Sequence, residues 1–217
     1  MPIHRRMSRG ILSGVSVAIL GTACARSTPA TQADGPTDPA LRQELIRMGM
    51  LDQTARIGMR TGIPADTVVM RSILAIDSIL TSRLRVVVRS QGWPTISRVG
   101  EAAARAAFLI VQHSPIGAFQ REVLPHLVAA AQAGEASRSD AAMLEDRVLT
   151  EDGKPQLYGT QFRIVDGVLV PYPIAEPETL EQRRAEVGLM PMPEYVKLLE
   201  QTYGGPVRYP ATAPDSS

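Results

Sequence analysis

The stretch from residue 101 to residue 113 constrains the fold most, because it is the most apolar run that follows the first 25 residues. Five alanines occupy the seven positions from 101 to 107. Alanine loses no rotamer entropy in a helix, and its small side chain lets neighbouring elements approach closely. At helical spacing, Ala102, Ala106 and His113 fall on one face. The stretch therefore predicts a helix at the centre of the domain, with an imidazole on its buried side.

The bulk composition limits the class of protein. The chain has 217 residues, 44% of them hydrophobic and only 4% aromatic, and its formal net charge is +1. This length suits one domain with a core built mainly from aliphatic side chains. A charge so close to zero argues against nucleic-acid binding through bulk charge. No apolar run reaches the roughly 18 residues that a membrane-spanning helix needs.

Residues 1–25 have the pattern of a bacterial signal peptide of the lipoprotein type. Three arginines precede a short apolar segment, Ile11–Leu20, and small residues lead to Cys24, the only cysteine in the chain. We expect Cys24 to be lipidated, which would anchor the domain to the membrane of the bacterial cell envelope. The alternative is cleavage by ordinary signal peptidase, followed by secretion or release into the periplasm. In both cases disulfides and thiolate sites are excluded from the domain itself.

The rest of the chain divides into three parts. Residues 26–37 are rich in Ser, Thr, Pro and Gly and predict a flexible tether. Residues 38–203 form the predicted globular domain, and residues 204–217 a disordered tail. Apolar periodicity, together with proline, glycine and acidic boundary residues, predicts about seven helices. These cover residues 38–60, 65–90, 97–113, 117–133, 139–149, 177–187 and 193–203.

Between the fifth and sixth of these helices the apolar pattern alternates. The alternating segments flank Asp166-Gly167, a dipeptide suited to a tight turn. They predict a β-hairpin over residues 156–172 that docks on the helices, because an isolated hairpin is marginally stable. The predicted fold is therefore mainly α, formally α+β: a helical bundle of about seven helices with one docked β-hairpin.

Six short motifs spread over residues 41–200 point to a family. They are Asp52-Gln53-Thr54-Ala55-Arg56, Gly92-Trp93-Pro94, Val111-Gln112-His113, Asp146-Arg147-Val148, Gln156-Leu157-Tyr158-Gly159-Thr160-Gln161 and Arg183-Arg184-Ala185-Glu186-Val187-Gly188-Leu189. Together they resemble a bacterial family of helical domains of unknown function that often follow signal peptides. The resemblance implies a fold group and an exported protein, and it implies no activity.

Several polar residues lie on or beside the apolar stripes, among them Asp52, Asp77, His113 and Asp146. Burying an unpaired charge is costly, so these groups must be paired or hydrogen-bonded. Arginine is the best partner for a carboxylate. The available partners are Arg56, Gln112, Arg147, Gln156, Tyr158, Thr160, Gln161, Arg183 and Arg184.

Three hypotheses for this polar cluster remain open. The first is a structural network that pins the hairpin to the helices. The second is a pocket for a small polar or anionic ligand, bound by Asp52, Arg56, Gln112, Arg147, Gln156, Thr160, Gln161, Arg183 and Arg184. The third is a hydrolytic enzyme in which His113 is the general acid or base, oriented by Asp146 or Asp52, with Tyr158 or Thr160 near the reacting group.

No metal or cofactor is predicted. His126 follows Glu122 by four residues, but Pro125 lies between them and the sequence offers no third ligand. No phosphate-binding glycine loop and no nucleophile-elbow motif occurs. The expected partners are the membrane, through the lipid anchor, and a small ligand. The oligomeric state is open.

Overall fold

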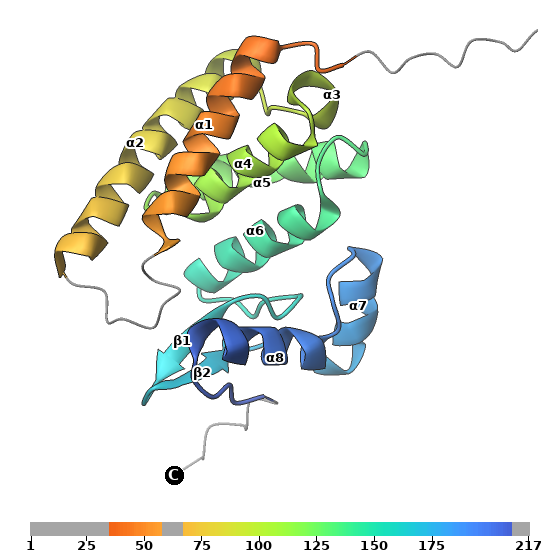
Figure 1. The fold of residues 1–217 in the computed structure, drawn as a ribbon. Helices are drawn as coiled ribbons and strands as arrows, with labels where there is room; N and C mark the ends of the chain where they lie inside the picture. Colours follow the sequence, from red (N-terminus) through yellow and green to blue (C-terminus); the bar gives the residue numbers. More distant parts are fainter. Residues whose placement is uncertain (1–34, 58–66, 210–217) are drawn as a thin grey trace, which may run out of the picture. The chain divides into compact units, whose positions relative to one another are not determined.

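The computed structural model describes residues 35–57 and 67–209 (Figure 1). This part contains eight α-helices and one two-stranded hairpin, which confirms the predicted mainly helical fold with a single hairpin. The helices are α1 (Pro39–Ala55), α2 (Thr67–Gln91), α3 (Ile96–Val99), α4 (Glu101–Gln112), α5 (Gly117–Gln132), α6 (Arg138–Glu151), α7 (Leu180–Glu186) and α8 (Met192–Tyr203). The predicted signal peptide with Cys24, most of the tether, and residues 210–217 lie outside the described residues.

Two groups of elements flank α6 (Figure 1). On one side α1 packs against both α2 and α4, and α5 joins α4 to α6. On the other side lie the hairpin, α7 and α8. Within the described residues, no helix combines the length and apolar character needed to cross a membrane.

Helix α1 begins where the sequence predicts and ends earlier. The Asp38 side chain accepts a hydrogen bond from the backbone N–H of Leu41 at 3.0 Å, and Pro39 occupies the first turn. The last helical residue is Ala55, whereas the predicted helix continues to residue 60. Its apolar stripe, which includes Leu41 and Leu45, is buried in the main core.

The predicted helix over residues 97–113 is in fact two helices. Gly100 has φ +81°, a conformation open to glycine, and it separates the short α3 from α4. The predicted buried face of α4 is also partly wrong, because Ala102 is exposed while Ala103, Ala107 and Phe108 are fully buried. Helix α4 is enclosed by α1, α5 and α6, so most of its circumference faces the core.

Helices α1 and α4 approach each other through two small residues. A Cβ atom added to Gly49 of α1 would lie 2.7 Å from the Cβ of Ala106 in α4. Such a separation is well inside van der Waals contact, so only glycine fits at this crossing. The close approach brings the C-terminal turn of α1 within hydrogen-bond reach of the C-terminal end of α4.

The hairpin is shorter than predicted. Strands β1 (Phe162–Val165) and β2 (Val168–Pro171) pair antiparallel, with Phe162 opposite Pro171. The turn uses Asp166 and Gly167, both at positive φ, as the sequence predicts. Residues 156–161 do not extend β1, since the backbone N–H groups of Leu157, Tyr158 and Thr160 bind a buried carboxylate described below.

The predicted disordered tail is wrong for its first residues. The backbone N–H of Leu169 donates to the carbonyl of Pro206 at 3.1 Å, and the N–H of Arg208 donates to the carbonyl of Leu169 at 2.8 Å. The chain after α8 therefore runs along β2 and covers part of its edge. Pairing of this kind protects an otherwise open strand edge.

The contact between α1 and α4 can be tested with Gly49→Ala. Alanine favours a helix by about 1 kcal/mol over glycine, yet overpacking costs typically 1–3 kcal/mol. A separation of 2.7 Å places the overpacking cost in the upper part of that range, about 2–3 kcal/mol. After the helix gain we expect the added methyl to lower the free energy of unfolding by about 1–2 kcal/mol, measured by urea denaturation. Met50→Ala is the matched control, because Met50 is 64% exposed and its change should be near zero. Equal or higher stability of Gly49→Ala would show that the helices do not touch there.

Candidate functional site

A cavity of about 530 Å³ opens between α4, α6, the hairpin and α8. Aliphatic and aromatic side chains from all four elements form most of its wall. Polar groups come from α4, α6 and the loop before β1. The lining residues are Arg105, Phe108, Leu109, Gln112, His113, Met143, Arg147, Thr160, Gln161, Phe162, Ile164, Gly167, Leu169, Tyr195, Leu199, Tyr203, Gly205 and Pro206. This set, drawn from the described residues, includes two arginines and a histidine and no aspartate or glutamate.

The end of α4 places two of these residues. Helix α4 ends at Gln112, and His113 is its C-terminal cap. From α5, the buried Gln120 donates through Nε2 to the carbonyl of Val111 at 3.0 Å, with longer contacts to the next carbonyls. Carbonyl groups at a helix end need such partners. Gln120 therefore fixes the turn from which Gln112 and His113 project.

His113 is held by a buried carboxylate of α1. Its Nδ1 lies 2.9 Å and 3.0 Å from the two carboxylate oxygens of Asp52. The Asp52 side chain is 1% exposed, and the His113 side chain is 25% exposed at the cavity wall. Because a carboxylate only accepts, Nδ1 carries the proton in this contact. In the neutral ring the lone pair is then on Nε2.

Asp52 has further partners that compensate its burial. Arg56 donates through Nη1 to Asp52 at 2.9 Å, and through Nη2 to both oxygens of Asp77 in α2 at 2.7 Å and 2.8 Å. Gln53 donates to Asp52 at 2.7 Å. Although burial raises the pKa of Asp52, the hydrogen bond and charge of His113, with Gln53 and Arg56, hold that pKa below its ordinary value. Asp52 thus stays ionised behind the imidazole.

Arg147 of α6 faces the same cavity with a neutral partner. The Gln112 amide, turned so that its oxygen faces the guanidinium, accepts from Arg147 Nε at 2.9 Å and from Nη2 at 3.0 Å. Among the described residues no carboxylate forms an ion pair with Arg147. Burial lowers the pKa of Arg147, and the charge of Glu151 offsets part of this shift. The positive charge is therefore oriented and desolvated, and the charge of Glu151 compensates it only in part.

Asp146, the neighbour of Arg147, belongs to a different network. Its carboxylate accepts from the backbone N–H groups of Leu157, Tyr158 and Thr160 at 2.7, 3.0 and 2.9 Å. The Thr160 hydroxyl adds a fourth bond at 2.9 Å. Burial raises the pKa of Asp146, and these donors offset part of the shift. Because the loop N–H groups bind this side chain, they cannot join a strand ladder.

The carbonyl groups of the same loop bind arginines of α7. Arg183 donates to the carbonyl of Leu157 at 2.8 Å, and Arg184, which is 1% exposed, donates to the carbonyl of Tyr158. Gln156 closes the loop, with Nε2 3.0 Å from the carbonyl oxygen of Gln161 and Oε1 accepting from the N–H of Gln161 at 2.8 Å. These side chains are occupied by the backbone and hold the loop in place.

Apart from Tyr158, the predicted catalytic and ligand-binding residues therefore fall into three groups. Gln112, His113, Arg147, Thr160 and Gln161 line the cavity. Asp52 and Arg56 lie behind His113. Those that bind the loop backbone without lining this cavity are Asp146, Gln156, Arg183 and Arg184. Tyr158 lines another cavity, of about 250 Å³, together with Glu145. The structure thus places Asp52, and not Asp146, beside His113.

Most of the lining residues were not predicted from the sequence, and Arg105 and Tyr195 are two polar ones among them. Arg105 is one helical turn before Phe108 and two turns before Gln112, so helical spacing from Gln112 would have found it. Tyr195 repeats on α8 with Leu199 and Tyr203 at four-residue intervals. Nothing in the sequence indicated that this stripe would meet α4.

A comparison with protein-family models places this arrangement in a known group. A family described as of unknown function, DUF6624, matches residues 39–208. The chain belongs to this family. The matched region begins with α1 and includes every element of the site, and it confirms the expected resemblance to a family of unknown function. The bacterial and exported character stays a prediction. Comparisons with curated proteins and with solved structures found no match.

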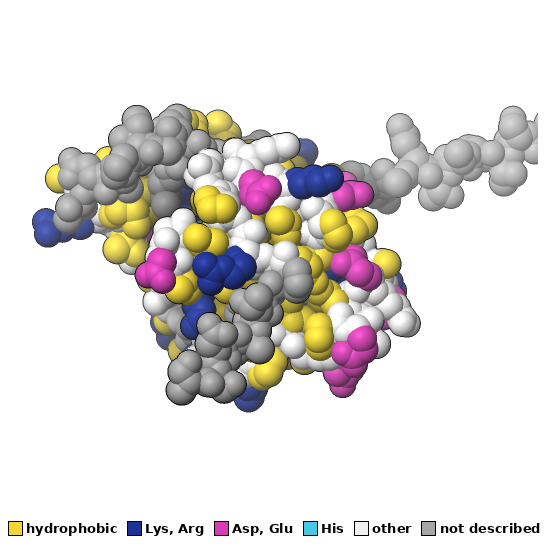
Figure 2. All heavy atoms as spheres, turned by 90° about the horizontal axis from the view of Figure 1, so that it is seen from below, with side chains coloured by type: hydrophobic (Ala, Val, Ile, Leu, Met, Phe, Trp, Pro, Cys, Tyr) yellow, Lys and Arg dark blue, Asp and Glu magenta, His cyan; other side chains and the backbone are white. Residues whose placement is uncertain are grey.

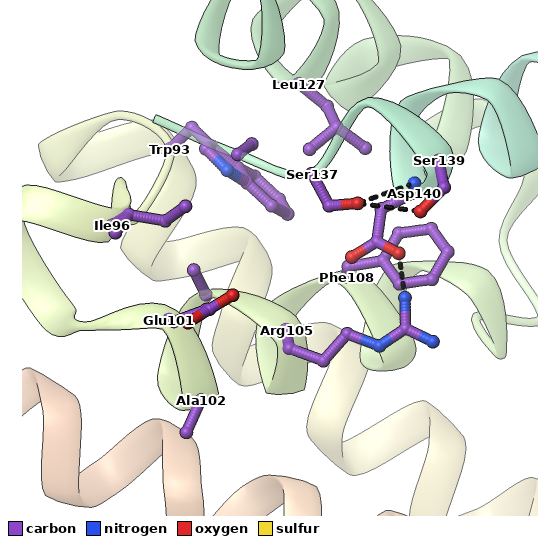
Figure 3. A pocket seen from close by; sticks show the side chains of 12 residues that line it. Trp93, Ile96, Glu101, Ala102, Arg105, Phe108, Leu127, Ser137, Ser139 and Asp140 are labelled. Atoms are coloured by element: carbon purple, nitrogen blue, oxygen red, sulfur yellow. Dashed lines mark hydrogen bonds and ion pairs between the residues drawn. The ribbon is translucent and has the colours of Figure 1, made fainter. Parts of the chain in front are cut away.

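The DUF6624 domain has a second cavity, of about 740 Å³, where α4 meets the start of α6 (Figure 3). Trp93, Phe108 and Leu127 contribute apolar surface there, and Arg105 and Asp140 point toward each other as an ion pair. Ser137 and Ser139 are hydrogen-bonded to each other at 2.8 Å. The positive charge of Arg105 in this second cavity is thus already balanced by Asp140. Among the described residues no cluster of three or more side chains suited to a metal ion occurs.

The Asp52 network predicts how stability depends on pH. The pKa of Asp52 is lowered in the folded state. The contribution of Asp52 to the free energy of unfolding is therefore fully present above its unfolded-state pKa of about 3.9. This contribution to stability is lost as the pH falls through the pKa that Asp52 has in the folded state. We expect Asp52→Asn to lower the free energy of unfolding by about 2–3 kcal/mol at pH 7, since hydrogen bonds to charged groups are lost.

Urea denaturation of both proteins at several values between pH 7 and pH 3 measures this difference, which should narrow below about pH 4. Asp166→Asn is the control, because Asp166 lies in the exposed hairpin turn and at positive φ, where asparagine is tolerated. A pH-independent cost of Asp52→Asn would show that the carboxylate charge makes no contribution.

Proposed function

We propose that this domain binds a small organic anion, with its acidic group on Arg147 and its apolar body along the walls of the cavity between α4, α6, the hairpin and α8. The observation that carries the proposal is the state of Arg147, which is turned into the cavity by a neutral amide and lacks a carboxylate partner among the described residues. A bound anion would replace the hydration that the Arg147 guanidinium has lost on burial. Arginine binds carboxylates and phosphates in a bidentate manner.

The charge of the lining supports an anion over a cation. Arg105 is neutralised by Asp140 and His113 is paired with Asp52, so Arg147 supplies the free positive charge. Outside the cavity, the side of the molecule that carries the hairpin and α8 shows basic, acidic and hydrophobic side chains interspersed (Figure 2). Anion recognition on this side is therefore concentrated in the cavity and is not a property of a broad basic surface.

The size and polarity of the cavity define the ligand class. A volume of about 530 Å³ accommodates one small molecule. Phe108, Met143 and Phe162 provide apolar wall, and Gln161 provides an amide on the lining. Such a lining suits an amphipathic anion, with a carboxylate or a phosphate as its head group.

Arg147→Gln should weaken this binding strongly. Calorimetric titration of the full-length protein with hexanoate and with hexyl phosphate distinguishes the two head groups, and hexanamide is the neutral reference. Loss of a charge-assisted bidentate contact of about 2–3 kcal/mol corresponds to a 30- to 150-fold higher dissociation constant. Arg121→Gln is the control, because Arg121 pairs with Asp152 on the surface away from the cavity. Equal affinity for hexanoate and hexanamide, or binding unchanged in Arg147→Gln, contradicts the proposal.

We further propose that Cys24 anchors the domain to the bacterial cell envelope through a lipid. The support is the order of basic, apolar and small residues in 1–25, ending at the single cysteine. Export would expose the ligand cavity to small molecules of the envelope and outside the cell.

Detergent phase partitioning of the protein expressed with its leader in a bacterium tests the anchor. We expect the native chain in the detergent phase and Cys24→Ser in the aqueous phase, since acyl chains supply about 0.8 kcal/mol per buried methylene. Ser27→Ala, three residues further on, should behave as the native chain. A native chain found in the aqueous phase contradicts lipidation and favours ordinary signal cleavage.

A further inference from the structure

We propose that the Asp52–His113 pair makes this cavity a hydrolytic site for a carboxylic ester that carries a free carboxylate. This inference rests on the proposed function, because Arg147 holds the free carboxylate of the substrate. It goes further by assigning a reaction to the imidazole beside that anion site.

The imidazole has the connections of a general base. Asp52 occupies Nδ1 at 2.9 Å and so leaves the Nε2 lone pair available in the neutral ring. No described residue forms a hydrogen bond with Nε2, and the ring is partly exposed on the cavity lining. An imidazole fixed in one tautomer by a buried carboxylate, with its other nitrogen open, is the arrangement that proton transfer requires.

The position of Asp52 makes it a positioning residue and not merely a counterion. Its oxygens also accept from Arg56 and Gln53, and Arg56 is held in turn by Asp77. Three helices thus fix the carboxylate, and rotation of the imidazole would cost its bond to Asp52. A site held by such outer partners keeps its geometry during a reaction.

The lining determines the nucleophile. The described lining residues include no serine, cysteine or lysine. The only aliphatic hydroxyl among them, that of Thr160, already donates to Asp146 at 2.9 Å. We therefore take water as the nucleophile in the proposed reaction.

The step balances without any other reactant. Nε2 of His113 takes a proton from water as the water oxygen bonds to the ester carbonyl carbon, and the carbonyl π electrons move to its oxygen. The oxyanion is stabilised by the positive charge of the imidazolium that forms on His113 in the same step. It then re-forms the C=O bond and expels the alkoxide, which receives the proton from Nε2. The products are a carboxylic acid and an alcohol, and His113 returns to its neutral form.

The test uses the full-length protein with 4-nitrophenyl hydrogen adipate, an ester with a free carboxylate. Release of nitrophenolate is followed, and binding of adipate is measured separately by calorimetry. We expect His113→Gln to lower kcat by at least about 100-fold, with the adipate dissociation constant changed less than about twofold. Asp52→Asn should lower kcat in the same way, since the amide can favour the wrong tautomer, and Asp52→Glu should restore part of it.

A control and a rescue separate chemistry from folding. His126→Gln alters an exposed histidine of α5 that is not on the cavity lining, and it should leave kcat unchanged. Added imidazole should restore part of the activity of His113→Gly if the lost group acts chemically. Adipate binding without turnover, or turnover unaffected by His113→Gln, overturns the hydrolysis and leaves the anion site standing. Failure of the native chain to bind adipate overturns both proposals.

Discussion

The structure depends on the compensation of one buried charge, the carboxylate of Asp52. An ionised group without access to water is tolerated only when its neighbours replace the lost hydration. Here the replacement comes from two places, since His113 belongs to the end of α4 and Gln53 and Arg56 follow Asp52 along the chain. Asp77 of α2 binds Arg56 and so holds one of these donors in place. The contact of Gly49 with Ala106 is what allows these groups to meet. The packing of small residues thus sets the geometry of the polar cluster.

The domain contains two polar networks. They differ in whether their hydrogen-bond donors and acceptors are already bound by other groups of the protein. Around Asp146 the carboxylate binds loop N–H groups, and Arg183 and Arg184 bind loop carbonyls, so the network is closed upon the backbone. Around His113 one ring nitrogen is bound and the other is open, and the side-chain hydrogen bonds of Arg147 go to an amide and not to a carboxylate. Closed networks of this kind add rigidity, whereas open groups on a cavity wall are available to a ligand.

Much of the fold follows from local patterns, and the pairing of the polar residues does not. Asp38-Pro39 and Asp166-Gly167 have turn and cap preferences that act within a few residues, so they predict their elements well. Polar residues on apolar stripes also predicted burial at Asp52 and Asp146. Which of these carboxylates lies beside His113 depends on how the helices cross. The local sequence patterns give no distance between either carboxylate and His113. The loop 156–161 has strand-like alternation, but three of its backbone N–H groups donate to the buried carboxylate of Asp146 from α6 and so do not form a strand ladder.

The two networks are linked through neighbours in sequence. Asp146 and Arg147 are consecutive on α6, so the residue that fixes the loop is adjacent to the residue that faces the cavity. The fixed loop in turn carries Thr160 and Gln161 to the cavity lining, where Gln112 and Arg147 also lie. The motifs that suggested the family therefore contain both a structural residue and a cavity residue, often side by side. A rigid backbone scaffold beneath an open, charged cavity is what a binding or catalytic site requires, because a displacement of about 1 Å in such groups is enough to lose the function.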